Sequence, residues 1–293
     1  MGRNASTRPG FDPAVVADIL SHMLEGIDGS SRPRLVGLSA LQGSGKSTLA
    51  AQLVAAATER GVAALTLSLD DVYFGRRRRQ ALAREVHPLL AVRTVPGTHD
   101  IGLLERTLDA LGSASRAAPA RIPRFDKGID TRLPPSRWRR VHEAPQLIVL
   151  EGWCIGVTAE DDSALLEPVN ALEREHDPDR RWRRFVNAQL AGDYARLWRR
   201  IERLVLLRAP SYEIVRRWRE EQERSLRRRG AARAMSPAQV RHFLEFAERL
   251  SRHALATLPG RADLIVALDE ERKVTSIIAR TPRAASRGPV GRH

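Results

Sequence analysis

The stretch that decides the fold is LVGLSALQGSGKST, which spans residues 35–48. The apolar run 35–38 predicts a buried strand, and the residues from Ser47 onward predict a helix. Gly43 and Gly45 let the backbone between them curl so that successive N–H groups point at an anion. The N-terminus of the helix adds its partial positive charge. The order of strand, glycine-rich loop and helix therefore predicts a phosphate-binding loop.

The side chains of this loop predict a nucleoside triphosphate as its ligand. Lys46 would reach the β- and γ-phosphates, and the hydroxyl of Ser47 would ligate Mg²⁺. The usual pattern has glycine at position 40, where this chain has Ala40. The alternative is a turn without a ligand, which the order of the elements disfavours. The predicted nucleotide-binding residues are Gly43, Ser44, Gly45, Lys46, Ser47 and Thr48.

The composition predicts anionic partners. The chain of 293 residues carries 49 basic and 35 acidic residues, a net charge of +14. A basic balance suits nucleotides, acidic metabolites or nucleic acid. The arginines are dispersed among glutamates, as in 216–229, which indicates solvated helix faces and makes nucleic acid an unlikely partner. Oligomeric state is not readable from these patterns.

Lysine and cysteine are both rare. The three lysines are Lys46, Lys127 and Lys273, so a position that keeps lysine is a candidate for a compact point charge. The single cysteine, Cys154, excludes a disulfide within the chain and a cysteine-based zinc site, and we expect a cytoplasmic protein. No run approaches the ~20 apolar residues of a membrane-spanning helix, so no membrane association is predicted.

Apolar periodicity predicts an alternation of strands and helices. The predicted strands are 35–38, 62–69, 147–150, 204–207, 264–268 and 274–278. The predicted helices are 11–27, 47–57, 100–111, 181–203, 212–229 and 237–257, with 72–90 helical in part and its Arg76–Arg79 run exposed. This alternation predicts an α/β fold of the P-loop NTPase type, a mostly parallel sheet flanked by helices.

Two acidic residues follow predicted strands. Because parallel strands deliver side chains to a crevice at their carboxyl ends, Asp70 is placed to orient or deprotonate an acceptor hydroxyl. Glu151, which follows 147–150, suits support of Mg²⁺. Taken alone, Asp70 would indicate only a helix cap, and Glu151 only the exposed end of a strand. Together with the loop they predict a kinase that transfers a γ-phosphate to a small alcohol.

Two polar segments suggest the acceptor. They are RTVPGTHD at 93–100 and PRFDKGID at 123–130, and each alone would read as a loop. With SLDDVY at 68–73 and EGWC at 151–154 they resemble the D-glycerate 3-kinase family, within the uridine kinase, phosphoribulokinase and pantothenate kinase group. The resemblance covers about residues 34–260, and Ala40 is the family's form.

The resemblance implies roles for individual residues. Asp70 would be the catalytic base, acting with Lys46 on ATP and with Mg²⁺ at Ser47 and Glu151. The acceptor site would be lined by His99, Asp100, Arg124 and Lys127. The arginine-rich helix would be a mobile lid, whose Arg216 and Arg219 clamp the transferring phosphoryl group. The alternative for that helix is a solvated charged face.

The expected organisation has three parts. Residues 1–33 would form an N-terminal helix with a mobile start, 34–280 a kinase domain with a lid at about 211–235, and 281–293 a disordered tail. The predicted reaction is ATP-dependent phosphorylation of D-glycerate to 3-phosphoglycerate. A nucleoside, pantothenate or another sugar acid is the alternative acceptor. A nucleotide-regulated nucleic-acid-binding protein is the non-enzymatic alternative.

Overall fold

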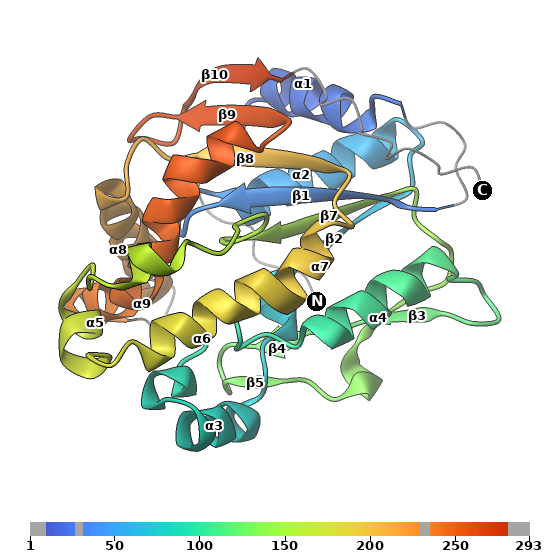
Figure 1. The fold of residues 1–293 in the computed structure, drawn as a ribbon. Helices are drawn as coiled ribbons and strands as arrows, with labels where there is room; N and C mark the ends of the chain where they lie inside the picture. Colours follow the sequence, from blue (N-terminus) through green and yellow to red (C-terminus); the bar gives the residue numbers. More distant parts are fainter. Residues whose placement is uncertain (1–9, 27–31, 229–234, 281–293) are drawn as a thin grey trace, which may run out of the picture.

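A six-stranded sheet forms the centre of the protein (Figure 1). The structure is a computed structural model that describes residues 10–26, 32–228 and 235–280. The strand order is β10-β9-β8-β1-β7-β2, and only β10 runs antiparallel to its neighbour. The strands are β1 (Arg34–Ala40), β2 (Ala64–Ser68), β7 (Leu147–Gly152), β8 (Arg203–Arg208), β9 (Leu264–Leu268) and β10 (Val274–Ala279). The predicted mostly parallel α/β sheet is therefore confirmed.

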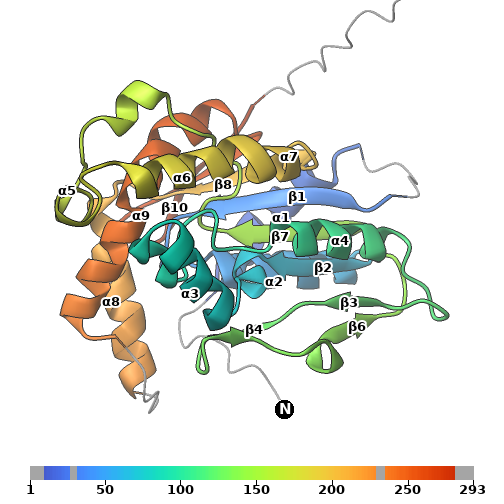
Figure 2. The same cartoon turned by 60° about the horizontal axis from the view of Figure 1, so that its bottom comes forward.

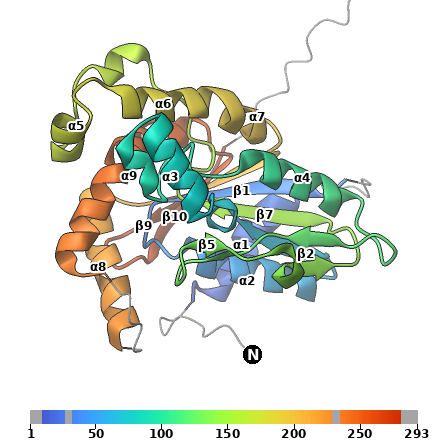
Figure 3. The ribbon, with the colours of Figure 1, turned by 90° about the horizontal axis from the view of Figure 1, so that it is seen from below.

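Helices cover both faces of this sheet. They are α1 (Pro13–Leu24), α2 (Lys46–Glu59), α3 (Arg76–Glu85), α4 (Ile101–Gly112), α5 (Ala171–His176), α6 (Arg181–Gln189), α7 (Ala195–Trp198), α8 (Glu213–Arg228) and α9 (Pro237–Thr257). One core holds side chains of α1, α2 and α8, and the other holds side chains of α4 and α6. Helix α9 contributes to both cores, and α8 and α9 run side by side at one end of the sheet (Figure 3).

The central strands are buried on both faces, as their apolar runs predict. Every residue of β7 is buried, and β1 is buried from Leu35 to Ala40. Strand β1 pairs in parallel with β7 on one side and with β8 on the other. In a parallel sheet all the carboxyl ends lie at one edge. The loop after β1 therefore lies beside the residues that follow β2 and β7.

Local capping interactions start two of the predicted helices. The side chain of Asp12 accepts a hydrogen bond from the Ala14 amide and starts α1, with Pro13 at the first helical position. Ser236 and Gln239 form a reciprocal capping box that starts α9. The predicted mobile start, the disordered tail and the end of the predicted lid fall on 1–9, 281–293 and 229–234, outside the described residues.

Some sequence-based expectations differ from the structure. The long helix predicted at 181–203 ends at Trp198 and contains a π-helical turn at Leu190–Tyr194 between α6 and α7. The Arg76–Arg79 run is not exposed throughout, because Arg79 is 2% exposed. Its guanidinium hydrogen-bonds the carbonyls of Phe74 and Ala91 and the carboxylate of Asp130, which makes burial of the charge tolerable.

Two small antiparallel ribbons were missed. One pairs β3 (Ala120–Ile122) with β6 (Arg139–Val141), and β3 lies beside α4 (Figure 2). The other pairs β4 (Phe125–Asp126) with β5 (Thr131–Arg132). Strands of two or three residues are too short for a pattern of alternating hydrophobicity, so periodicity does not detect them. Among the described residues, no helix combines the length and the apolar character needed to cross a bilayer.

Candidate active site

A cavity of about 1530 Å³ lies where the loops after β1, β2 and β7 meet. Its walls include the whole predicted phosphate-binding loop from Gly43 to Thr48, together with residues of α8 and of the β9–β10 turn. The predicted residues Asp70, Lys127 and Arg219 also line it. Folding thus brings together side chains that are far apart in the sequence.

The loop has the backbone geometry that its glycines predict. Gly43 has a φ of 79° and Gly45 a φ of 97°, both in the left-handed region that glycine tolerates best. Gly45 directly precedes α2, so the free N–H groups of the first helical turn face the loop. A Cβ on Gly43 would lie 2.9 Å from the Cβ of Trp218 in α8. The loop is therefore held tightly against the predicted lid helix.

Several buried polar atoms around the loop have no hydrogen-bond partner among the described residues. They include the hydroxyl of Ser44 and both amide atoms of Gln42. A buried polar group without a partner costs free energy, so these atoms are expected to meet a ligand or water. Gln42 was not predicted as a site residue, and its position inside the loop is the signal that would have suggested it.

An oxygen pair suited to a divalent cation lies at the end of the loop. The hydroxyl of Ser47 donates to Oε1 of Glu151 across 3.3 Å. Glu151 is 5% exposed, and its Oε2 has no partner among the described residues. A hydroxyl and a carboxylate are the hard oxygen ligands that Mg²⁺ prefers. The donor set predicted for the metal therefore fits Mg²⁺.

The carboxylate of Asp70 forms an ion pair with Lys127. Asp70 lies in a short 3-10 turn just after β2, and its Oδ2 is 2.6 Å from Nζ of Lys127. Burial by itself would raise the pKa of Asp70, but the charges of Lys127 and Lys46 outweigh burial and hold the pKa well below its usual value. Asp70 is therefore ionised wherever the protein is folded near neutral pH.

His99 is fixed as a neutral ring beside this pair. Its ring stacks on Tyr73 with centroids 4.1 Å apart, and its Nδ1 is 2.6 Å from the hydroxyl of Tyr194. The Gly97 amide donates to the same hydroxyl at 3.2 Å. Burial lowers the pKa of His99 to about 3. The Nε2 of the neutral His99 ring is buried and unpartnered among the described residues.

Three predicted acceptor residues, His99, Asp100 and Arg124, and one predicted lid residue lie away from the cavity lining. Asp100 caps α4 through the Leu103 amide and pairs with Arg132 across 3.1 Å, so its role in the structure is architectural. Arg124 is exposed. On α8, Arg219 lines the cavity and pairs with Glu223, whereas the exposed Arg216 does not line it.

The turn between β9 and β10 contributes an arginine that the sequence did not suggest. Arg272 adopts a φ of 68° and donates from Nε to the carbonyl of Gly43 at 2.7 Å. Its guanidinium also lies 4.8 Å from the ring of Trp218 and pairs with Glu221, both on α8. Arg272 thus joins the phosphate-binding loop to the predicted lid helix.

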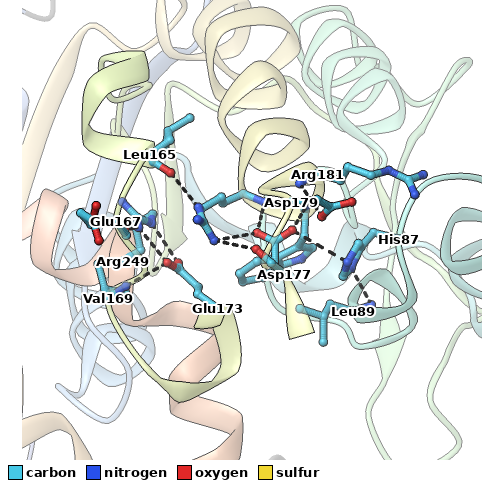
Figure 4. A network of polar contacts seen from close by, with 12 residues as sticks. His87, Leu89, Leu165, Glu167, Val169, Glu173, Asp177, Asp179, Arg181 and Arg249 are labelled. Atoms are coloured by element: carbon cyan, nitrogen blue, oxygen red, sulfur yellow. Dashed lines mark hydrogen bonds and ion pairs between the residues drawn. The ribbon is translucent and has the colours of Figure 1, made fainter. Parts of the chain in front are cut away.

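A second cluster of titratable groups lies at the start of α6 (Figure 4). Ligand atoms of His87, Asp177 and Asp179 lie within 4.8 Å of one another. The Leu89 amide donates to Nδ1 of His87, so the neutral ring carries its proton on Nε2, the nitrogen that faces Asp177. Both carboxylate oxygens of Asp177 accept backbone N–H bonds of α6. This cluster is therefore a helix cap, and it does not suit a metal.

The chain is similar in sequence to two curated proteins. No protein-family model matches the chain. A protein of Schizosaccharomyces pombe named "Uncharacterized kinase mug58" is 30% identical over 271 residues, which are 88% of this chain and 96% of the relative. The chloroplastic D-glycerate 3-kinase of Arabidopsis thaliana is 31% identical over 271 residues, 84% of this chain and 55% of the relative. The chain thus spans about half the length of the plant protein.

Solved structures share the fold. The D-glycerate 3-kinase of Cryptococcus neoformans superimposes with a TM-score of 0.72 at 22% identity, covering 92% of this chain and 97% of the other. The structure of YGR205w protein gives a TM-score of 0.71 at 23% identity, covering 92% and 99%. Three observations agree that this chain is a kinase. They are a relative matched over nearly its whole length, a shared fold, and a phosphate-binding loop beside an ionised carboxylate. The chain belongs to the same family of kinases as the Schizosaccharomyces pombe relative, and it is similar in sequence and in fold to D-glycerate 3-kinases.

Proposed function

We propose that this kinase uses ATP to phosphorylate D-glycerate, giving 3-phosphoglycerate. The observation that carries the proposal is the Asp70–Lys127 ion pair in the wall of the cavity that also holds the phosphate-binding loop. The plant relative is named a D-glycerate 3-kinase, which supports the choice of acceptor. The cationic groups around the cavity suit a substrate that carries a carboxylate.

The proposed step is an in-line transfer to a hydroxyl oxygen. Asp70 accepts the proton of the acceptor hydroxyl while that oxygen forms a bond to the γ-phosphorus, and the bond to the β–γ bridging oxygen breaks to release ADP. Lys127 keeps Asp70 ionised and oriented. The N–H groups of 43–48 and the ammonium group of Lys46 balance the negative charge of the phosphates.

Mg²⁺ would be held by Ser47 and Glu151, and it would neutralise phosphate charge when bound. The neutral ring of His99 would offer its unpartnered Nε2 to the acceptor site, and Asp100 would support the site through its cap on α4. Of the two predicted lid arginines, Arg219 lines the cavity and Arg216 does not, so we assign Arg219 to the transferring phosphoryl group. The cytoplasmic location stays a prediction that rests on the single, buried Cys154.

An acceptor screen tests the proposal. Purified protein with ATP and Mg²⁺ is offered D-glycerate, L-glycerate, other sugar acids, pantothenate and nucleosides, and ADP release is coupled to an optical assay. We expect D-glycerate to give the highest kcat/KM and the product to carry phosphate on the 3-hydroxyl. Rapid turnover of a nucleoside with no turnover of hydroxy acids would contradict the assignment.

The Asp70→Asn variant tests the role of the base. Loss of a general base typically costs about 10²–10⁴-fold in turnover, and we expect a kcat loss in that range with ATP affinity kept. Asp71→Asn is the matched control, because Asp71 accepts the Phe125 amide at 3.0 Å and asparagine keeps an oxygen for that bond. Equal losses in the two variants would remove Asp70 from the proposed role.

A further inference from the structure

Arg93 presents a guanidinium to the cavity that the proposed chemistry does not yet use. It lies in the loop that leads to α4, lines the cavity, and its side chain is 31% exposed. Its neighbour Arg79 also lines the cavity but is 2% exposed. The nitrogens of Arg79 bond the carbonyls of Phe74, Ala91 and Asp130 as well as the Asp130 carboxylate, whereas within the described residues Arg93 hydrogen-bonds through Nη1 to Asp130.

The two arginines share one carboxylate. Oδ2 of Asp130 is 2.6 Å from Nη2 of Arg79, and Oδ1 of Asp130 is 2.5 Å from Nη1 of Arg93. Two cations and one anion leave this part of the wall with one net positive charge. Because Nη2 and Nε of Arg93 make no bond within the described residues, a carboxylate from a ligand can complete this cluster.

The position of Arg93 is fixed relative to Asp70. The carbonyl of Thr94, the next residue, accepts hydrogen bonds of 3.2 Å from the hydroxyl of Tyr73 and from the indole of Trp153. Tyr73 follows β2 and Trp153 follows β7, so the loop that carries Arg93 is tied to the strand ends that present the proposed base.

The turn between β4 and β5 ties the two ion pairs together. This turn carries Lys127, which pairs with Asp70, and Asp130, which pairs with Arg93. The side chain of Asp126 accepts the Gly128 and Ile129 amides and holds the turn closed. Through these two partners the turn links the guanidinium of Arg93 to the carboxylate of Asp70, and both groups line the cavity.

We propose that Arg93 binds the carboxylate of the acceptor, with Asp130 as the residue that positions its guanidinium. This inference rests on the proposed function and gives it a specificity-determining residue. Arg124, the arginine that the resemblance placed in the acceptor site, is exposed and outside the cavity lining. A planar guanidinium matches a carboxylate through two parallel N–H···O bonds, so Arg93 selects hydroxy acids over neutral alcohols.

Steady-state kinetics on matched acceptors test the inference. Arg93→Gln and wild type are compared on D-glycerate and on its neutral counterparts glyceramide and glycerol. We expect Arg93→Gln to lower kcat/KM for D-glycerate about 100-fold, mostly through KM, because a charge-assisted contact to the substrate is lost. For the two neutral acceptors we expect a change below about threefold, since they carry no group for this contact. The ratio of ATP hydrolysis without acceptor to turnover of D-glycerate should rise in Arg93→Gln, because only the second reaction uses this contact.

The alternative is that Arg93 contacts the phosphoryl group. That alternative predicts equal losses of kcat/KM on charged and neutral acceptors, together with slower ATP hydrolysis. Either this result or wild-type kinetics in Arg93→Gln overturns the inference. Arg93→Lys keeps the positive charge but not the planar guanidinium that makes two parallel hydrogen bonds, so it should recover only part of the D-glycerate activity. Its thermal unfolding midpoint and that of Arg93→Gln check that the fold is intact. Arg78→Gln is the control, an exposed arginine on α3 that pairs with Glu85.

The screen separates failure of this inference from failure of the proposed function. If D-glycerate is inert but another hydroxy acid reacts, the proposed acceptor is wrong, and the same comparison on that acid and its amide decides the role of Arg93. If a neutral alcohol is the best acceptor of the wild-type enzyme, both the proposed function and the carboxylate role of Arg93 are overturned.

Discussion

The charge state of one carboxylate governs the proposed chemistry. Asp70 is partly buried, with a side chain that is 29% exposed, and burial favours its protonated form, yet Lys127 and Lys46 keep it ionised. The two lysines that fall in the predicted motifs thus both act on the same carboxylate. A compact ammonium group suits this task better than a planar guanidinium, because it places a point charge 2.6 Å from a single oxygen.

Removing Lys127 should move the pH profile. In wild type the pKa of Asp70 is depressed, so we expect kcat/KM to show no acidic limb from this group between pH 5 and 8. In Lys127→Met one of the two positive charges that lower the pKa of Asp70 is lost. The pKa of Asp70 then rises, because burial favours the protonated form. Activity is then lost as pH falls through the raised pKa, which the pH dependence of kcat/KM measures. Profiles that superimpose after scaling would argue against the coupling.

His99 should make the fold acid-sensitive. Its folded-state pKa of about 3 lies below its ordinary value of 6.5, so the unfolded state binds more protons between these values. Stability is full above pH 6.5 and falls as pH drops toward 3, by about 1.4 kcal/mol per pH unit for one group. His99→Asn keeps an acceptor for Tyr194 without the titration. Urea unfolding at several pH values should therefore show a shallower acid loss in the variant, and equal slopes would contradict this account.

Helix α8 has a charged face toward solvent, and its opposite face packs against the phosphate-binding loop and the β9–β10 turn. From the sequence, a mobile lid and a solvated charged face were alternatives for this helix. The structure adds a contact between the helix and the phosphate-binding loop that neither alternative included. Trp218 is fully buried, lies against Gly43, and donates from its indole to the Glu270 carbonyl at 2.7 Å. One side chain of this helix thus reaches both the phosphate-binding loop and the β9–β10 turn.

Two substitutions at Trp218 should separate packing from hydrogen bonding. Trp218→Ala should destabilise the protein by about 3–5 kcal/mol, because it leaves a cavity between α8 and the loop. Trp218→Phe keeps most of the ring and loses the bond to Glu270, for a cost of about 1–3 kcal/mol. Urea unfolding measures both values, and ATP affinity should weaken more in the alanine variant. Similar unfolding midpoints for all three proteins would show that this contact does not hold α8.

At the scale of the whole molecule, buried ion pairs hold the long connection from β7 to α6 (Figure 4). Arg249 of α9 bonds both carboxylate oxygens of Glu173 and also the carbonyls of Ala164 and Glu167. Arg183 of α6 bonds the buried carboxylate of Asp177. The connection is therefore fastened to α9 at one point and to α6 at another.

Breaking one of these pairs should unfold much of the connection. Arg249→Met leaves Glu173, which is 1% exposed, without its cation and should cost about 3–5 kcal/mol. The double variant with Glu173→Gln should recover part of that loss, because the charge of Glu173 is then no longer buried without its cation. Arg252→Met is the control on the same helix: its side chain is 47% exposed, and its ion pairs should contribute less than about 1 kcal/mol. Equal losses at the two arginines would contradict the argument.

The sequence by itself determined the elements whose cause is local. The phosphate-binding loop follows from glycine conformations at Gly43 and Gly45, and the starts of α1 and α9 follow from caps at Asp12 and Ser236. Each of these depends on neighbours within a few residues, so a pattern along the chain can show it. The carboxylate Asp70 was also predictable, because the carboxyl ends of parallel strands share one edge of the sheet.

The tertiary structure alone decided which loop side chains enter the cavity. Arg93 and Asp130 are 37 residues apart, and nothing local indicates that they pair. The same holds for the burial of Arg79 and for the exposure of Arg124. The direction of a side chain in an irregular loop is set by the surfaces that pack against the loop, and these come from distant segments. The sequence therefore identified the phosphate-binding loop, and the three-dimensional packing decided which arginines line the cavity.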